Sequence, residues 1–244
     1  PHHAIWDDHD YGPNNSNTSY EMREVALESF KQYWGNKTYG EVGNSGTYGK
    51  FTHVDAEFFL LDGRYHRAAN RMDKDNPDKA YLGKRQMEWL KSGLLSSTST
   101  FKFVASGSQV LNPLNDHECF RTYEKEHTEL LEFIKKHKIK GVVFLSGDRH
   151  HSVITKVEEE GFYPLYDITS SPLSSGAYKP RGKEAENPYF VKNTLYGSQN
   201  YLKVSISGER KARGMVISCY DAHSNEKQWE YAIEANDLQV PKKK

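Results

Sequence analysis

The order of the expected secondary-structure elements limits this chain of 244 residues to few architectures. Strands and helices alternate before position 150, whereas strands predominate after it. Apolar residues at helical spacing predict helices near 18–34, 82–94 and 127–138. This order favours an α/β sandwich whose last sheet is largely antiparallel. The expected strands are Ala4–Trp6, Phe51–Val54, Glu57–Leu61, Phe101–Ala105, Val142–Leu145, Ser152–Val157, Tyr163–Ile168, Tyr201–Ser207, Met215–Tyr220 and Gln228–Ile233.

The first expected helix begins where Thr18 and Glu21 can form a capping box. Its apolar side chains recur at helical spacing and predict one buried face, made of Met22, Val25, Ala26, Phe30, Tyr33 and Trp34. The segment 35–49 carries five glycines and little periodicity, which predicts an irregular loop.

Charge and cysteine content exclude several classes of protein. Lys plus Arg and Asp plus Glu both number 33, so the net charge of zero gives no global field to attract nucleic acid or an anionic membrane. The residues Lys242–Lys244 predict a solvated tail rather than a nucleic-acid surface. Cys119 and Cys219 could form one disulfide or none. No apolar run reaches the roughly 18 residues that span a bilayer, and the first residues do not form a signal peptide.

Two clusters of acidic residues and histidines each follow an expected strand. They are Asp7–Asp10, with the sequence DDHD, and Gly147–His151, with the sequence GDRHH. Carboxylates and neutral imidazoles bind metal ions that polarise a phosphoryl oxygen and lower the pKa of bound water. Asp148 and His150 are two residues apart, so both can point toward a common centre. Taken alone, either cluster is more often a turn or a helix cap than a metal site.

Four motifs in a fixed order add to this interpretation. They are Trp6–Asp10 with Asn14 and Asn15, Phe59–Arg67, Leu82–Leu90 with Gln86 and Trp89 inside it, and Phe144–His150. Together they resemble the PhoD-like phosphatases over most of the chain, from Pro1 to about Ile233. Four ordered motifs are far harder to meet by chance than any one of them.

The resemblance implies a metallophosphoesterase-like αββα sandwich of two β-sheets flanked by helices, with metal ligands at strand ends. It implies that residues 1–236 are the C-terminal part of such a domain, lacking its N-terminal strands, and that 237–244 form a Lys-rich tail. The implied activity is phosphoester hydrolysis by a metal-activated water that attacks phosphorus, on a small-molecule monoester or diester.

The same resemblance assigns roles to the two clusters. His9 takes the position of a histidine that contacts phosphate or protonates the leaving oxygen, and His151 would contact the metal ligands rather than the metal. The oxygen-rich ligand set favours two metal sites holding iron with calcium, with zinc or manganese as alternatives. The implied metal ligands are Asp7, Asp8, Asp148 and His150.

Two further residues have candidate roles in substrate binding. Arg64 matches a Leu-Asp-x-Arg motif of the family and is expected to clamp a phosphate oxygen through its planar guanidinium. The alternative for Arg64 is a partly buried ion pair with Asp62 or a place on the surface. Asn15 is expected to reach the substrate or the metal, or to be only a turn residue.

Other functions remain open. In the family, motifs that supply the bridging carboxylate precede Trp6–Asp10, so an upstream segment of the same protein is expected to complete the site. Without it, the chain would be a non-catalytic fragment or a degenerate module used for binding. A one-metal amidase at Asp148 and His150 is a weaker hypothesis because the spacing identifies no third ligand. The resemblance places the protein in the periplasm or outside the cell.

Overall fold

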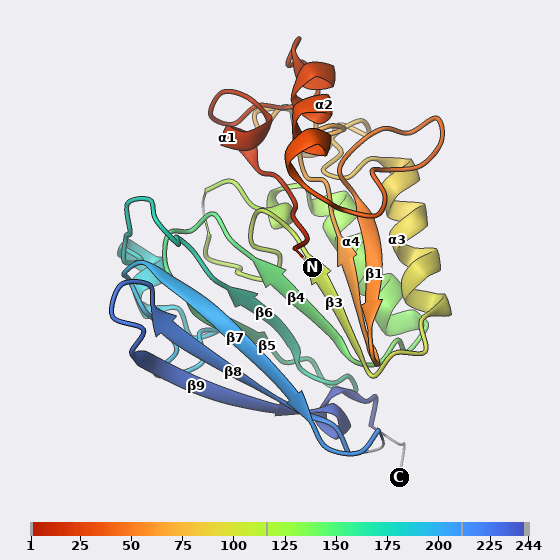
Figure 1. The fold of residues 1–244 in the computed structure, drawn as a ribbon. Helices are drawn as coiled ribbons and strands as arrows, with labels where there is room; N and C mark the ends of the chain where they lie inside the picture. Colours follow the sequence, from red (N-terminus) through yellow and green to blue (C-terminus); the bar gives the residue numbers. More distant parts are fainter. Residues whose placement is uncertain (1, 116, 211, 242–244) are drawn as a thin grey trace.

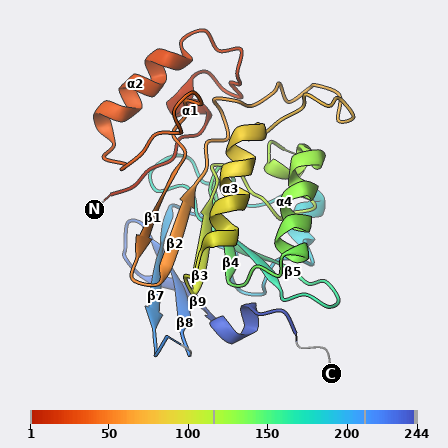
Figure 2. The ribbon, with the colours of Figure 1, turned by 90° about the vertical axis from the view of Figure 1, so that its right-hand side faces the viewer.

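The computed structural model describes residues 2–115, 117–210 and 212–241. Two β-sheets face each other, and helices α3 (Lys84–Ser96) and α4 (Glu124–Lys136) cover the outer face of the larger sheet (Figure 1). Seen from the side of these helices, the smaller sheet lies behind the larger one (Figure 2). The predicted α/β architecture with two sheets is confirmed.

The larger sheet has six strands in the order β1-β2-β3-β4-β6-β5. β2, β3, β4 and β6 run parallel, and β1 and β5 pair antiparallel at the two edges. Because the parallel strands end at the same edge, this carboxyl edge gathers the loops that follow them, including 147–151. The strands are β1 (Gly49–His53), β2 (Ala56–Leu60), β3 (Phe101–Ala105), β4 (Val142–Ser146), β5 (Val153–Val157) and β6 (Leu165–Thr169).

The smaller sheet consists of β7 (Asn200–Ser207), β8 (Gly214–Asp221) and β9 (Lys227–Glu234). Its strands pair antiparallel in chain order, as the sequence predicts. Met215 and Trp229 belong to the same buried apolar cluster as residues of the larger sheet, so one core fills the space between the sheets.

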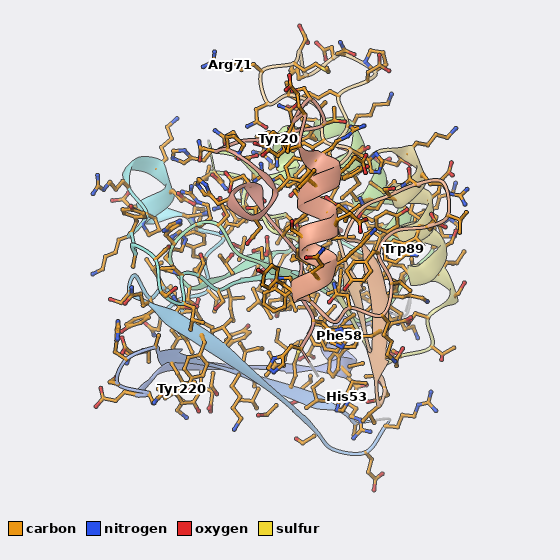
Figure 3. All side chains as sticks on the ribbon, turned by 45° about the horizontal axis from the view of Figure 1, so that its top comes forward. Tyr20, His53, Phe58, Arg71, Trp89 and Tyr220 are labelled. Atoms are coloured by element: carbon orange, nitrogen blue, oxygen red, sulfur yellow. The ribbon has the colours of Figure 1, made fainter. Side chains whose placement is uncertain are left out.

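Strand β2 shows how the two faces of the larger sheet are covered. Neighbouring residues in a strand point to opposite faces. Phe59 contacts Trp89 of α3 edge-on, with ring centroids 6.0 Å apart, whereas Phe58 stacks on Phe103 of β3 at 4.8 Å (Phe58 and Trp89 are labelled in Figure 3). The sheet therefore packs on helices with one face and on the smaller sheet with the other.

The strand expected at Ala4–Trp6 is wrong. The backbone N–H and C=O of Ala4 pair with the side-chain amide of Asn36, at 2.9 and 2.7 Å, instead of with a neighbouring strand. Trp6 is nevertheless buried in a small separate apolar cluster, and its indole N–H donates to Asp62 at 2.7 Å. Side-chain contacts, rather than strand pairing, hold this segment in place.

Helix α2 (Arg23–Tyr33) is confirmed, but its expected apolar face and capping box are wrong in part. The helix begins after Met22 without a side-chain cap, and Leu27 and Phe30 are its buried residues. It lies at the top of the molecule beside the short helix α1 (Asp8–Tyr11), away from the sheets (Figure 1). A helix that packs against its neighbours along one side only buries a narrow stripe of side chains. Four residues of the expected apolar face are therefore exposed: Met22, Val25, Tyr33 and Trp34.

Packing extends past the expected domain boundary at 236. The short helix Ala235–Leu238 follows β9, and Leu238 is fully buried in the core. The residues Lys242–Lys244 of the expected tail lie outside the described part of the chain. Cys119 and Cys219 are both buried and unpaired. Within the described residues, no helix is long and apolar enough to cross a membrane.

Candidate active site

Two cavities, of about 740 and 490 Å³, open at the carboxyl edge of the larger sheet. The larger cavity is lined by Asn15, His151 and residues of several other loops, and the smaller one by Asp7 and His9. Both predicted clusters thus meet at one place, although they are far apart in the sequence. The residues that line both cavities are Asp8, Asn14, Asp148 and His150.

Helix α1 positions the first cluster. The Asp8 carboxylate accepts hydrogen bonds from the backbone N–H groups of His9 at 2.9 Å and Asn15 at 3.0 Å. Burial raises the pKa of Asp8, but these amides and the nearby Arg64 outweigh it, so the net pKa lies below the usual value. Asp8 is therefore a fixed, ionised carboxylate facing both cavities.

Negative charges surround Asp7 and Asp148, the other two acidic residues among the expected metal ligands. Burial and the nearby Asp148 carboxylate raise the pKa of Asp7 to about 7, against the attraction of Arg64. Burial raises the pKa of Asp148 as well, and the carboxylates of Glu118 and Asp8 add to it. Carboxylates that repel one another in a partly buried site are stabilised by a cation. The negative charge of this donor set therefore matches the positive charge of a metal ion.

The turn after β4 positions the second cluster in an unusual backbone conformation. Asp148 and His150 both have positive φ angles, of 64° and 57°. Non-glycine residues adopt this region at a cost, and such strain is concentrated at functional sites. The turn is anchored by the Gly147 N–H, which donates to Gly107 O at 3.0 Å, and by the His150 N–H, which donates to Ser171 Oγ at 2.8 Å.

The tautomer of His150 suits a metal ligand. Its Nδ1 contacts the carbonyl oxygen of Gly176, which can only accept a hydrogen bond, so Nδ1 carries the proton. Nε2 then presents its lone pair, in the arrangement common for metal-ligating histidines. Among the residues that the structure describes, however, no group of three or more His, Cys, Asp or Glu side chains could hold a metal ion.

Arg64 lies beneath the site rather than in it. Its side chain is 0% exposed, and its guanidinium binds Asp7 through Nε and Nη2, each at 2.6 Å, and Glu118 through Nη1 at 2.6 Å. The Asp62 carboxylate accepts a hydrogen bond from the backbone N–H of Arg64, at 2.8 Å, and not from its guanidinium. These contacts favour the ion-pair interpretation of Arg64 over the phosphate clamp, with different partners from the one expected.

Glu118 is a site residue that sequence reasoning missed. It lines the larger cavity and bridges two buried arginines, Arg64 and Arg67. No apolar periodicity or known motif surrounds it in the sequence, and its role follows only from the folding of its loop over the carboxyl edge.

The three remaining candidates differ in exposure. His9 is exposed and lines the smaller cavity, and the side chain of Asn15 is exposed at the larger one. His151 is buried, and its Nε2 makes no hydrogen bond within the described part of the chain. Burial, together with the nearby Arg149, lowers the pKa of His151 to about 4, so its ring is neutral at physiological pH.

Fold and site together define a two-sheet α/β protein with an acidic, histidine-containing cavity at the carboxyl edge of its larger sheet. The chain belongs to the PhoD-like phosphatase family, whose model matches residues 1–222.

Two relatives support this assignment. Alkaline phosphatase D of Bacillus subtilis (strain 168) is 26% identical over 180 residues, which are 61% of this chain and 31% of that protein. The solved structure titled "Structure of PhoD" matches with a TM-score of 0.73 at 17% identity, over 97% of this chain and 53% of that one, which confirms the fold. The chain therefore spans between about a third and about half the length of these relatives.

Proposed function

We propose that this chain contributes the active site of a metal-dependent phosphoester hydrolase. The convergence of the Asp7–Asp10 and Gly147–His151 clusters on adjoining cavities, in a chain of the PhoD-like phosphatase family, carries the proposal. The relative from Bacillus is named an alkaline phosphatase, which favours a small-molecule phosphoester as the substrate.

The chain's own residues have distinct roles in this proposal. Metal ions would be held by Asp7, Asp8, Asp148 and His150, and when bound they would polarise a phosphoryl oxygen and lower the pKa of water. Arg64 keeps the Asp7 carboxylate in place through an ion pair and one hydrogen bond from Nε. His9, exposed at the smaller cavity, donates a proton to the departing alcohol oxygen. Asn15, which lines the larger cavity, would contact the substrate through its amide.

We further propose that an upstream segment of the same protein supplies the missing metal donors. The described residues hold no group of three donors, whereas two metal sites need more ligands than these four side chains provide. Iron with calcium is the favoured pair, because carboxylates outnumber imidazoles in the ligand set. A periplasmic or extracellular location is also proposed, and fractionation of the source cells tests it.

The experiment combines metal content with activity in the full-length protein. Wild type should contain about two metal ions per chain, hydrolyse bis(p-nitrophenyl) phosphate, and lose activity on treatment with a chelator. Asp148→Asn removes one carboxylate while Asn tolerates the left-handed backbone, so metal content and activity should fall without unfolding. Asp78→Asn, at an exposed position outside both cavities, is the matched control. Full activity in Asp148→Asn and in His9→Ala would end the proposal.

A non-catalytic binding module is the second candidate, favoured by the lack of a three-donor group in the described residues. It predicts a stably folded full-length protein with no bound metal and no hydrolysis of phosphoesters. Elemental analysis of the purified protein separates the two candidates.

A further inference from the structure

Arg149 is a largely enclosed cation at the centre of the second cluster. It lies between Asp148 and His150 in the sequence and lines the larger cavity. Its side chain is only 13% exposed, so its guanidinium has one fixed direction instead of the many available to a surface arginine.

A chain of buried polar residues fixes this direction. Nη2 of Arg149 forms an ion pair with the Glu184 carboxylate, whose side chain is 7% exposed. Glu184 also accepts a hydrogen bond from Asn112 at 2.7 Å, and Asn112 is held by Gln109 at 3.0 Å and Asn187 at 2.8 Å. Arg149 is therefore positioned through a network of buried polar side chains.

The guanidinium retains unused donors. Nε of Arg149 is buried and makes no hydrogen bond within the described part of the chain, and no partner there contacts Nη1. Because Nε is buried, Nη1 is the donor left to bind a ligand anion in the larger cavity, and an anion there would also offset the cost of the unpaired charge. Arg64 also has a donor without a hydrogen bond, Nη2, but it differs from Arg149 because two carboxylates already neutralise it and its side chain is 0% exposed.

We propose that Arg149 is the residue that binds the anionic phosphoryl group in the larger cavity, and that Glu184 is the residue that positions it. The proposal rests on the proposed function and assigns to Arg149 the anion-binding role that the sequence motif suggested for Arg64. Arginine suits this role because its planar guanidinium can donate two parallel hydrogen bonds to one phosphoryl group.

The test measures phosphate binding separately from turnover in the full-length protein. The inhibition constant of inorganic phosphate, KM and kcat are determined with bis(p-nitrophenyl) phosphate as the substrate. Arg149→Gln should raise the inhibition constant by about 10- to 100-fold, the range for a charge-assisted hydrogen bond. Arg149→Lys should recover only part of this, because lysine keeps the charge without the planar donors.

Glu184 has its own readout. Glu184→Ala should raise KM and the inhibition constant, and Glu184→Gln should restore much of the phosphate binding, because glutamine keeps an acceptor for Arg149. The matched control is Lys183→Gln, an exposed neighbour that removes one positive charge outside both cavities and should leave the inhibition constant unchanged.

The outcomes are distinguishable. An active Arg149→Lys variant with the wild-type inhibition constant would overturn the assignment while the proposed function stands. An equal rise in the inhibition constant for Lys183→Gln and Arg149→Gln would also overturn it, because only net charge would then matter. Wild-type protein that neither hydrolyses the diester nor binds phosphate would refute the proposed function, and this inference with it.

Discussion

Replacing Arg64 by methionine should destabilise the protein strongly. Methionine fills much of the same volume but leaves the Asp7 carboxylate without its counter-charge, while Glu118 keeps its contact with Arg67. The side chain of Arg64 is 0% exposed and that of Glu118 is 10% exposed, so solvent screens these pairs weakly. Breaking a buried pair from one side costs about 3–5 kcal/mol.

This cost can be read in a melting experiment. In a domain of this size, 1 kcal/mol shifts the melting temperature by about 2–4 °C, so Arg64→Met should lower it by roughly 6–20 °C. Circular dichroism at 222 nm during heating measures the shift, provided that unfolding is reversible.

An exposed arginine provides the control. Arg85 pairs with Glu41 at 3.1 Å, but its side chain is 60% exposed. Arg85→Met should therefore cost under about 1 kcal/mol. The smallest expected cost, ~3 kcal/mol, corresponds to a shift of about 6 °C in the melting temperature. If Arg64→Met melts within about 3 °C of wild type and loses only phosphate binding, the buried-pair interpretation is refuted and the phosphate-clamp interpretation is favoured instead.

Three further predictions concern packing, pH and metal. A Cβ at Gly107 would lie 2.7 Å from Cγ of Asp7, so Gly107→Ala should displace this carboxylate and lower kcat by about 100-fold, with the far-ultraviolet spectrum unchanged. Burial lowers the pKa of His127 from 6.5 to about 4 in the folded protein. As the pH falls from above 6.5 toward 4, the unfolded chain binds a proton at His127 before the folded chain does, so the free energy of unfolding decreases over this range. Between pH 7.5 and 5 this loss is roughly 2 kcal/mol, and urea unfolding of His127→Gln should lack that share of the pH dependence. Chelator-treated wild type should regain activity with added iron and calcium, and recovery with zinc alone would contradict the proposed metals.

Much of the fold could be predicted because its strands have strong local signals. Val142–Ser146 is a continuous apolar run, and the antiparallel strands β7, β8 and β9 were expected within one or two residues of their observed bounds. The strand prediction for Ala4–Trp6 failed for a physical reason, since this segment pairs with the Asn36 and Asp62 side chains instead of with a strand, and such contacts leave no periodic pattern in the sequence.

The site was predictable only where charged residues were adjacent in the sequence. The clusters at Asp7 and Asp148 could be recognised, and the parallel strands explain why the second lies at the carboxyl edge. The partners of Arg64 and the ion pair of Arg149 with Glu184 depend on contacts between residues distant in sequence. Spacing carries no information about such contacts.

The attachment of the first cluster through side chains has a consequence for the protein's motions. Ala4 is held by Asn36, and Trp6 by Asp62 and by its small apolar cluster, and neither residue forms part of a sheet ladder. This segment can open without breaking a strand, so its amide hydrogens should exchange with solvent well before those of β3 and β4. The cavity wall that carries Asp7 and Asp8 should therefore become accessible to exchange earlier than the wall at Asp148, and its ion pair with the buried Arg64 is what ties it to the rest of the fold.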